Sequence, residues 1–144
     1  MSFSAVPLQY LLDTNICIFI IKNKPQTVRA RFETLRPGEV GISAVTEAEL
    51  LHGAYKSERV EHNLAAYYDF SAQMAVIAFD PQVTDAYGRI RAELERAGKP
   101  IGPLDFQIAA TAVACGLTLV TNNVSEFERV PGLSVEDWTR ANPS

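Results

Sequence analysis

Short apolar runs alternate along the chain with longer segments whose apolar residues recur at helical spacing. The runs occupy residues 9–12, 39–42, 74–79 and 117–121, and a weaker one occupies 133–135. Runs of this length are typical of strands buried on both faces, as in a parallel sheet covered by helices. The pattern therefore predicts an α/β fold with a central parallel sheet of four to five strands.

Helix-terminating residues agree with this alternation. Ser43 is a good N-cap for the segment that follows it, and Asp80-Pro81 precedes a clean apolar stripe that Gly98 ends. Pro103 suits the first turn of a helix that Gly116 closes. Residues 58–73 are expected to form a further helix with a less regular pattern. Because neither a linker nor an internal repeat interrupts the pattern, we expect a single domain over residues 1–144.

The composition suits one globular domain, with 144 residues of which 47% are hydrophobic and 21% charged. The longest nearly apolar stretch, residues 108–120, is too short to span a bilayer. The first residues lack the basic flank and long apolar block of a signal peptide. We therefore expect a cytoplasmic protein with no membrane partner, in which Cys17 and Cys115 are buried free thiols.

The net charge of −4 is evidence against a non-specific nucleic-acid binder, which normally carries a basic face. One segment is an exception: between Lys22 and Arg36, five basic residues stand against a single acid, Glu33. This segment is either a solvated helix face or a surface that contacts phosphate groups.

Four polar side chains from distant parts of the sequence are expected at one edge of the sheet. Asp13 directly follows the first predicted strand, and Glu49 lies in the second turn of the helix after the second strand. Asp105 lies in the first turn of the helix before the fourth strand, and Asn123 follows that strand. Ligands of open parallel sheets bind at the carboxyl ends of the strands, where these residues converge.

Each residue also has a purely structural explanation. Asp13 could cap a helix, and Thr46-x-x-Glu49 matches a capping box. Asp105 could complement a helix dipole, and Asn123 could be a turn residue.

Their apolar surroundings favour a shared metal site. Asp13 is flanked by leucines and isoleucine, and no lysine or arginine lies near these acids in the sequence. Burying several carboxylates together costs on the order of several kcal/mol of folding free energy per ion unless a cation pairs with them. Mg²⁺ prefers oxygen ligands, so we expect Asp13, Glu49 and Asp105 to bind a hard divalent cation.

An ordered set of segments resembles the PIN-domain nucleases, and most closely the VapC toxins of bacterial type II VapBC toxin–antitoxin systems. The resemblance runs from about Leu12 to Trp138. The segments that carry it are Leu12-Asp13-Thr14-Asn15, Ile42 to Leu50, Ile101 to Asp105, and Val120 to Asn123 with Glu126-Phe127 close behind.

The resemblance implies a three-layer α/β/α domain with an acidic site for Mg²⁺ or Mn²⁺. The first three acids of the family correspond to Asp13, Glu49 and Asp105, as metal ligands and catalytic residues. The fourth position, usually Asp, is Asn123 here, which removes one charge. Glu126 compensates only if it reaches the site.

The resemblance further implies a toxin with Mg²⁺-dependent endoribonuclease activity, acting on tRNA and by preference on the anticodon region of initiator tRNA. The expected partners are a VapB-like antitoxin, a second copy of the chain in a homodimer, and a higher hetero-oligomer of both. The alternative is a catalytically weak PIN-fold module that binds RNA or protein.

Two other classes with acidic pockets fit less well. Phosphatases with an Asp-x-Asp motif after the first strand need an acid where this chain has Asn15. A receiver-like signalling domain needs a phosphoacceptor Asp after the third strand and a Lys after the last, and neither is evident.

Overall fold

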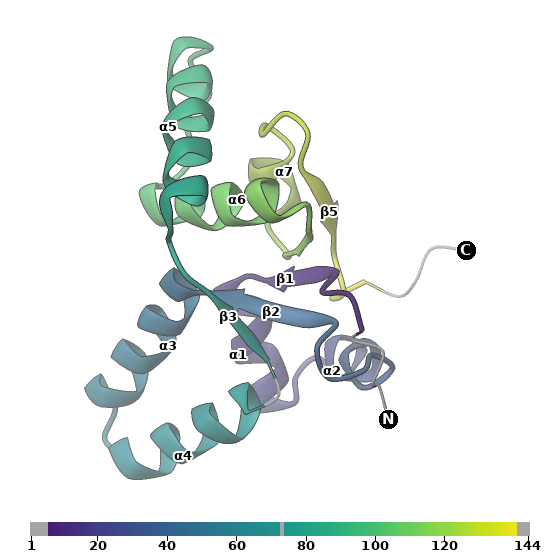
Figure 1. Ribbon diagram of the computed structural model, residues 1–144. Helices are drawn as coiled ribbons and strands as arrows, with labels where there is room; N and C mark the ends of the chain where they lie inside the picture. Colours follow the sequence, from purple (N-terminus) through teal and green to yellow (C-terminus); the bar gives the residue numbers. More distant parts are fainter. Residues whose placement is uncertain (1–5, 73, 141–144) are drawn as a thin grey trace, which may run out of the picture.

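A five-stranded parallel sheet with strand order β3-β2-β1-β4-β5 forms the centre of the protein (Figure 1). The structure is a computed structural model that describes residues 6–72 and 74–140. The strands are β1 (Tyr10–Leu12), β2 (Val40–Ser43), β3 (Ala75–Ile77), β4 (Thr118–Val120) and β5 (Ser134–Glu136). This sheet confirms the predicted fold class.

Helices cover both faces of the sheet and complete a three-layer α/β/α arrangement (Figure 1). One face carries α1 (Thr14–Lys22), α2 (Gln26–Glu33), α3 (Ala44–Lys56) and α4 (Val60–Ser71). The other face carries α5 (Pro81–Arg96), α6 (Pro103–Cys115) and the short α7 (Val124–Phe127). Within the described ranges, none of the helices has the length and hydrophobicity needed to cross a membrane.

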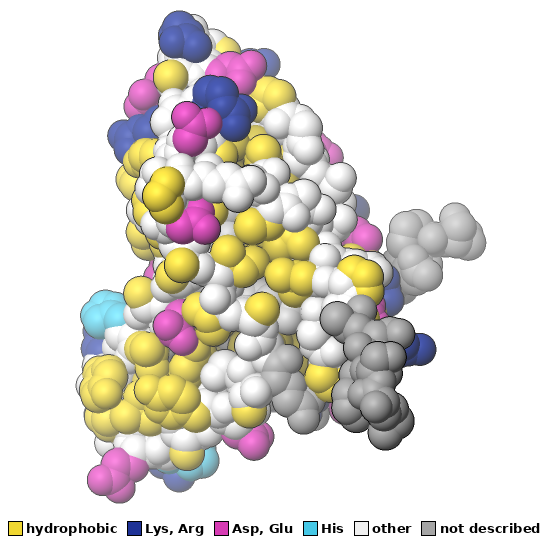
Figure 2. All heavy atoms as spheres, in the orientation of Figure 1, with side chains coloured by type: hydrophobic (Ala, Val, Ile, Leu, Met, Phe, Trp, Pro, Cys, Tyr) yellow, Lys and Arg dark blue, Asp and Glu magenta, His cyan; other side chains and the backbone are white. Residues whose placement is uncertain are grey.

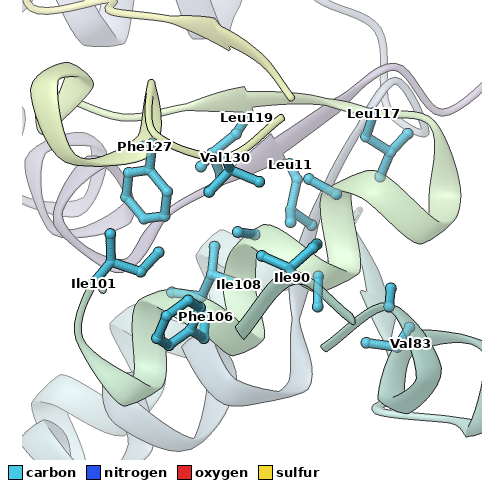
Figure 3. Packing of buried hydrophobic residues seen from close by; sticks show 14 of the residues in the cluster. Leu11, Val83, Ile90, Ile101, Phe106, Ile108, Leu117, Leu119, Phe127 and Val130 are labelled. Carbon is cyan, nitrogen blue, oxygen red and sulfur yellow. The ribbon is translucent and has the colours of Figure 1, made fainter. Parts of the chain in front are cut away.

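Two hydrophobic cores lie on opposite faces because successive strand residues point in opposite directions. Leu11 and Leu119 belong to the core under α5, α6 and α7, together with Phe106 and Phe127 (Figure 3). The neighbouring residues in the same strands, among them Leu12, belong to the core under α1 to α4. The central strands β2, β1 and β4 are therefore buried on both faces, as the apolar runs predicted.

The predicted capping residues act as expected. Ser43 accepts a hydrogen bond from the backbone N–H of Thr46, and Asp80 accepts one from that of Val83. Gly116 ends α6 in the left-handed region, at φ 66°. Such local agreement fixes where the helices begin and end, and so which residues stand at the edge of the sheet.

Three sequence-based expectations need correction or a limit. The apolar run 74–79 yields only the short β3, which lies at the edge of the sheet with Ala75 and Val76 exposed, because only β2 pairs with it. Cys17 is buried as expected, whereas Cys115 is exposed at the end of α6. The helix expected near residues 58–73 spans Val60–Ser71, and residue 73 lies outside the described residues.

Large apolar side chains are also exposed on α3 and α4. Tyr55 is 63% exposed and Tyr68 is 56% exposed. In Figure 2 hydrophobic side chains gather over the part of the surface where these two helices lie. This surface belongs to the half of the molecule below the sheet, away from α5.

Alanine substitutions at two glycines test whether one lies inside a helix and the other at a helix end. Gly88 lies inside α5 with open space around the position of a Cβ, so Gly88→Ala should raise the free energy of unfolding by about 0.5–1 kcal/mol. Gly116→Ala should lower it by about 1–2 kcal/mol, because alanine is strained at a positive φ. Urea denaturation of both variants measures the difference, and equal effects would contradict the assigned ends of α6.

Candidate active site

Asp13 lies directly after β1 and joins three elements through its carboxylate. Its Oδ1 accepts a hydrogen bond from the backbone N–H of Ile16 at 3.0 Å, so the residue caps α1. Its Oδ2 accepts one from the hydroxyl of Thr121, which follows β4. The capping explanation is therefore correct, but it does not account for a carboxylate that is only 6% exposed.

Glu49 is held beside Asp13 and not at the start of its own helix. Because Ser43 caps α3, Thr46 lies inside the helix and the predicted capping box is wrong. Glu49 instead accepts a hydrogen bond from the hydroxyl of Thr14 at 2.6 Å. Thr14 is the residue after Asp13, so this bond brings the second acid to the carboxyl end of β1.

Asp105 lies in the first turn of α6 and has a second acid, Glu126 of α7, as its neighbour. Glu126 accepts hydrogen bonds from the backbone N–H of Gly102 at 3.1 Å and from the side-chain amide of Asn123. A Cβ at Gly102 would come within 3.4 Å of Asp105 Oδ2. A Cβ would therefore fit at an ordinary contact distance, and Gly102 contributes to the site through its backbone N–H.

Asn123, predicted as a catalytic residue, lies at the N-cap position of α7 and orients Glu126. The sequence pattern did not predict α7, since its four residues are too few to display a helical period. The spacing of Asn123 and Glu126 was nevertheless visible in the sequence. The structure places Glu126, whose participation the sequence did not decide, in the site.

The four acids influence one another electrostatically. The pKa of Asp105 is raised to about 6, first by burial and then by the negative charges of Glu126, Asp13 and Glu49. Burial also raises the pKa of Asp13, although the hydrogen bonds from Thr121 and Ile16 act in the opposite direction. Among the described residues, no lysine or arginine forms an ion pair with any of these acids.

The carboxylates converge without forming a finished metal site. In residues 6–72 and 74–140, no three His, Cys, Asp or Glu side chains are placed so that they could hold a metal ion. Asp13 bonds to Thr121, Glu49 to Thr14, and Glu126 to Asn123, as expected for repelling carboxylates that each find a separate donor. The donor set is nevertheless all oxygen and rich in negative charge, which fits a hard divalent cation.

The basic segment from Lys22 to Arg36 lies at the opposite end of the sheet, because α1 starts at the acids and leads away from them. Arg31 packs against the rings of Tyr10 and Trp138 and lies 3.7 Å from a carboxylate oxygen of Glu136. These contacts favour a structural role for this arginine over a phosphate-contact surface beside the acids.

The fold and this acidic site define a class of protein. Residues 10–133 match the family described as PIN domain, and the chain belongs to that family. It is 52% identical to a protein of Shigella flexneri named "tRNA(fMet)-specific endonuclease VapC", in an alignment that covers 92% of this chain and 99% of that protein. The resemblance noted in the sequence is thus confirmed.

Two solved structures are similar over almost their whole length. A chain of DNA-bound VapBC from Salmonella typhimurium has a TM-score of 0.86 and 48% identity, with 91% of this chain and 98% of that chain covered. A chain of VapBC2 from Rickettsia felis, bound to a DNA fragment from its promoter, has a TM-score of 0.85 and 39% identity, with 91% and 99% covered.

The raised pKa of Asp105 predicts how stability changes with pH in the absence of divalent cations. A folded-state pKa of about 6, well above the ordinary value for an aspartate, means that the protonated form stabilises the fold at low pH and that this contribution is lost as the pH rises through 6. Asp105→Asn keeps a neutral side chain throughout. The free energy of unfolding of Asp105→Asn should therefore rise relative to that of wild type between pH 4 and pH 7.5. The expected rise is on the order of 1 kcal/mol, which includes a reduction for solvent screening.

Urea denaturation in EDTA across this pH range measures the advantage, and Asp85→Asn is the control because Asp85 is an exposed acid on α5. A difference between Asp105→Asn and wild type that stays constant with pH would contradict the electrostatic coupling of the four acids.

Proposed function

We propose that this chain is the toxin of a toxin–antitoxin pair and a metal-dependent endoribonuclease that hydrolyses phosphodiester bonds of tRNA. The observation that carries the proposal is the cluster of four acids at the carboxyl ends of the strands, with no basic partner among the described residues. The identity to a relative named for tRNA(fMet) supports initiator tRNA as the substrate, and we place the cleavage in its anticodon region. The whole chain, residues 1–144, acts as one PIN domain in the cytoplasm.

Asp13, Glu49 and Asp105 hold the cation in this proposal, and Glu126 supplies the negative charge that Asn123 lacks. Carboxylate oxygens favour Mg²⁺, with Mn²⁺ as a substitute. When bound, such a cation lowers the pKa of water and stabilises charge on phosphate oxygens.

The chain's own residues supply orientation and proton transfer. Thr121 and the Ile16 N–H fix the Asp13 carboxylate through two hydrogen bonds, so this acid has little rotational freedom. Glu49 is anchored by Thr14, and its second oxygen, which has no hydrogen-bond donor among the described residues, would accept a proton from the attacking water. Asn123 orients Glu126 and acts as a catalytic residue only through that acid.

The partner in this proposal is a small antitoxin, with a homodimer of the chain and a larger assembly of both proteins. Similar chains were solved as VapBC complexes. An acidic cluster without a basic partner is a suitable receptor for an arginine side chain, whose planar guanidinium bonds to carboxylates at two points. An antitoxin segment that delivers such an arginine would neutralise the same charges as the cation and block the enzyme.

Purified protein should cleave initiator tRNA only when Mg²⁺ or Mn²⁺ is present, and excess EDTA should stop the reaction. Glu49→Gln should reduce the cleavage rate at least 100-fold at nearly constant melting temperature, because general-base catalysis contributes roughly 10²–10⁴-fold. Glu47→Gln is the matched control, since Glu47 lies two residues away and bonds to Tyr67 outside the acidic cluster. Cleavage that persists in EDTA would refute the metal dependence.

Expression of the chain alone should arrest growth, and co-expression with the small gene beside its own should restore growth and give a stable complex. Replacing the arginines in the tail of that partner, one at a time, should identify one whose loss restores RNA cleavage by the complex. A partner that inhibits equally well without any of its arginines would exclude the neutralisation of the acids.

A further inference from the structure

Three aromatic side chains and one arginine lie in contact with one another at the same sheet edge as the acids. We call these four residues, Phe79, Tyr87, Arg91 and Phe106, the aromatic rim. Phe79 follows the carboxyl end of β3, as Asp13 follows that of β1. Two strand spacings, about 10 Å, separate these two positions along the sheet.

The members of the aromatic rim form a continuous series of contacts that ends beside the site. The ring centroids of Phe79 and Tyr87 are 5.8 Å apart, and those of Tyr87 and Phe106 are 6.4 Å apart, both edge-to-face. The Arg91 guanidinium lies 5.8 Å from the Tyr87 ring and 5.6 Å from the Phe106 ring. Phe106 follows Asp105 in α6, so the buried end of the rim is adjacent in the chain to one of the four acids.

Burial changes along the series from the interior to the solvent. Phe106 is 1% exposed and belongs to the core, Tyr87 is half-buried, and Phe79 is 38% exposed. The Arg91 side chain is 40% exposed and also pairs with Glu95. Core packing accounts for Phe106, whereas the Phe79 ring leaves more than a third of its surface in contact with water at the sheet edge where the acids lie.

The charge distribution indicates what the exposed ring would bind. The chain carries a net charge of −4, its acids repel phosphate in the absence of a cation, and its basic segment lies at the other end of the sheet. RNA binding at the site would therefore gain from an interaction that does not depend on net charge. Base stacking on an aromatic ring is such an interaction, and it is available only to unpaired bases.

We propose that Phe79 stacks against an unpaired base next to the cleaved phosphate, while Arg91 contacts the RNA backbone from its position over Tyr87. This inference rests on the proposed ribonuclease function and deepens it, since it names the residue that would position an unpaired base at the site. Phe79 is then a positioning residue that sets KM and substrate choice.

The test uses cleavage of the initiator tRNA anticodon stem-loop, both intact and with single abasic nucleotides in the loop. Phe79→Ala should raise KM between about 5-fold and 100-fold for the intact RNA, with a smaller change in kcat. At one loop position the abasic RNA should abolish the difference between Phe79→Ala and wild type. Phe79→Trp should restore KM because it restores a ring.

Val76→Ala is the matched control. Val76 is 41% exposed and lies on β3, the strand that Phe79 follows, but it comes before the sheet edge. It should leave KM unchanged. Equal penalties for Phe79→Ala on intact and abasic RNA at every loop position would overturn the proposal. So would a change from dimer to monomer in light scattering, since Phe79 would then cover a second copy of the chain.

The contact between Phe79 and RNA can be tested separately from the proposed ribonuclease activity. If wild type does not cleave the stem-loop, fluorescence anisotropy of the same labelled RNA still compares the affinities of wild type and Phe79→Ala. Weaker binding by Phe79→Ala supports the aromatic rim as an RNA contact even without cleavage. Equal affinities, or no binding by wild type, overturn it.

Discussion

The hydrogen bonds of the buried Asp13 carboxylate are the interaction on which the site depends. One oxygen caps α1 and the other bonds to Thr121 beyond β4, so the carboxylate fixes β1, α1 and β4 relative to one another. Without these donors, burial of the carboxylate would cost on the order of several kcal/mol of folding free energy. Structural and functional explanations of Asp13 are therefore not alternatives, because the bonds that make its burial tolerable also hold the acid where Glu49 and Asp105 can meet it.

The fold and the three principal acids could be predicted from the sequence because both follow from local rules. Apolar runs such as 117–121 are too short for helices and alternate with longer segments of helical period, which implies a parallel sheet. In such a sheet every strand ends at the same edge, so Asp13 and Asn123 were expected at one edge. The position of Glu49 also followed, since Ser43 fixed the start of its helix.

The parts that could not be predicted depend on contacts between distant segments. Glu126 reaches the site through α7, a single helical turn with no periodic pattern, and through the N–H of Gly102, which is 24 residues away in the sequence. The basic segment that contains Arg31 was open to two interpretations, a solvated helix face or a phosphate-contact surface, and neither includes the contacts of Arg31 with Trp138 and Glu136 from the other end of the chain. The edge position of β3 likewise follows from strand order, which composition does not encode.

Gly102 has a consequence for how the anchoring of Glu126 tolerates change in the sequence. Its backbone N–H donates the hydrogen bond to Glu126, and a Cβ built at this position would meet Asp105 Oδ2 at 3.4 Å, an ordinary van der Waals distance. Every residue except proline supplies a backbone N–H, so this anchor does not depend on which side chain stands at position 102. The second anchor, from the side-chain amide of Asn123, has no such protection, because it is lost when that residue is replaced by one without a donor.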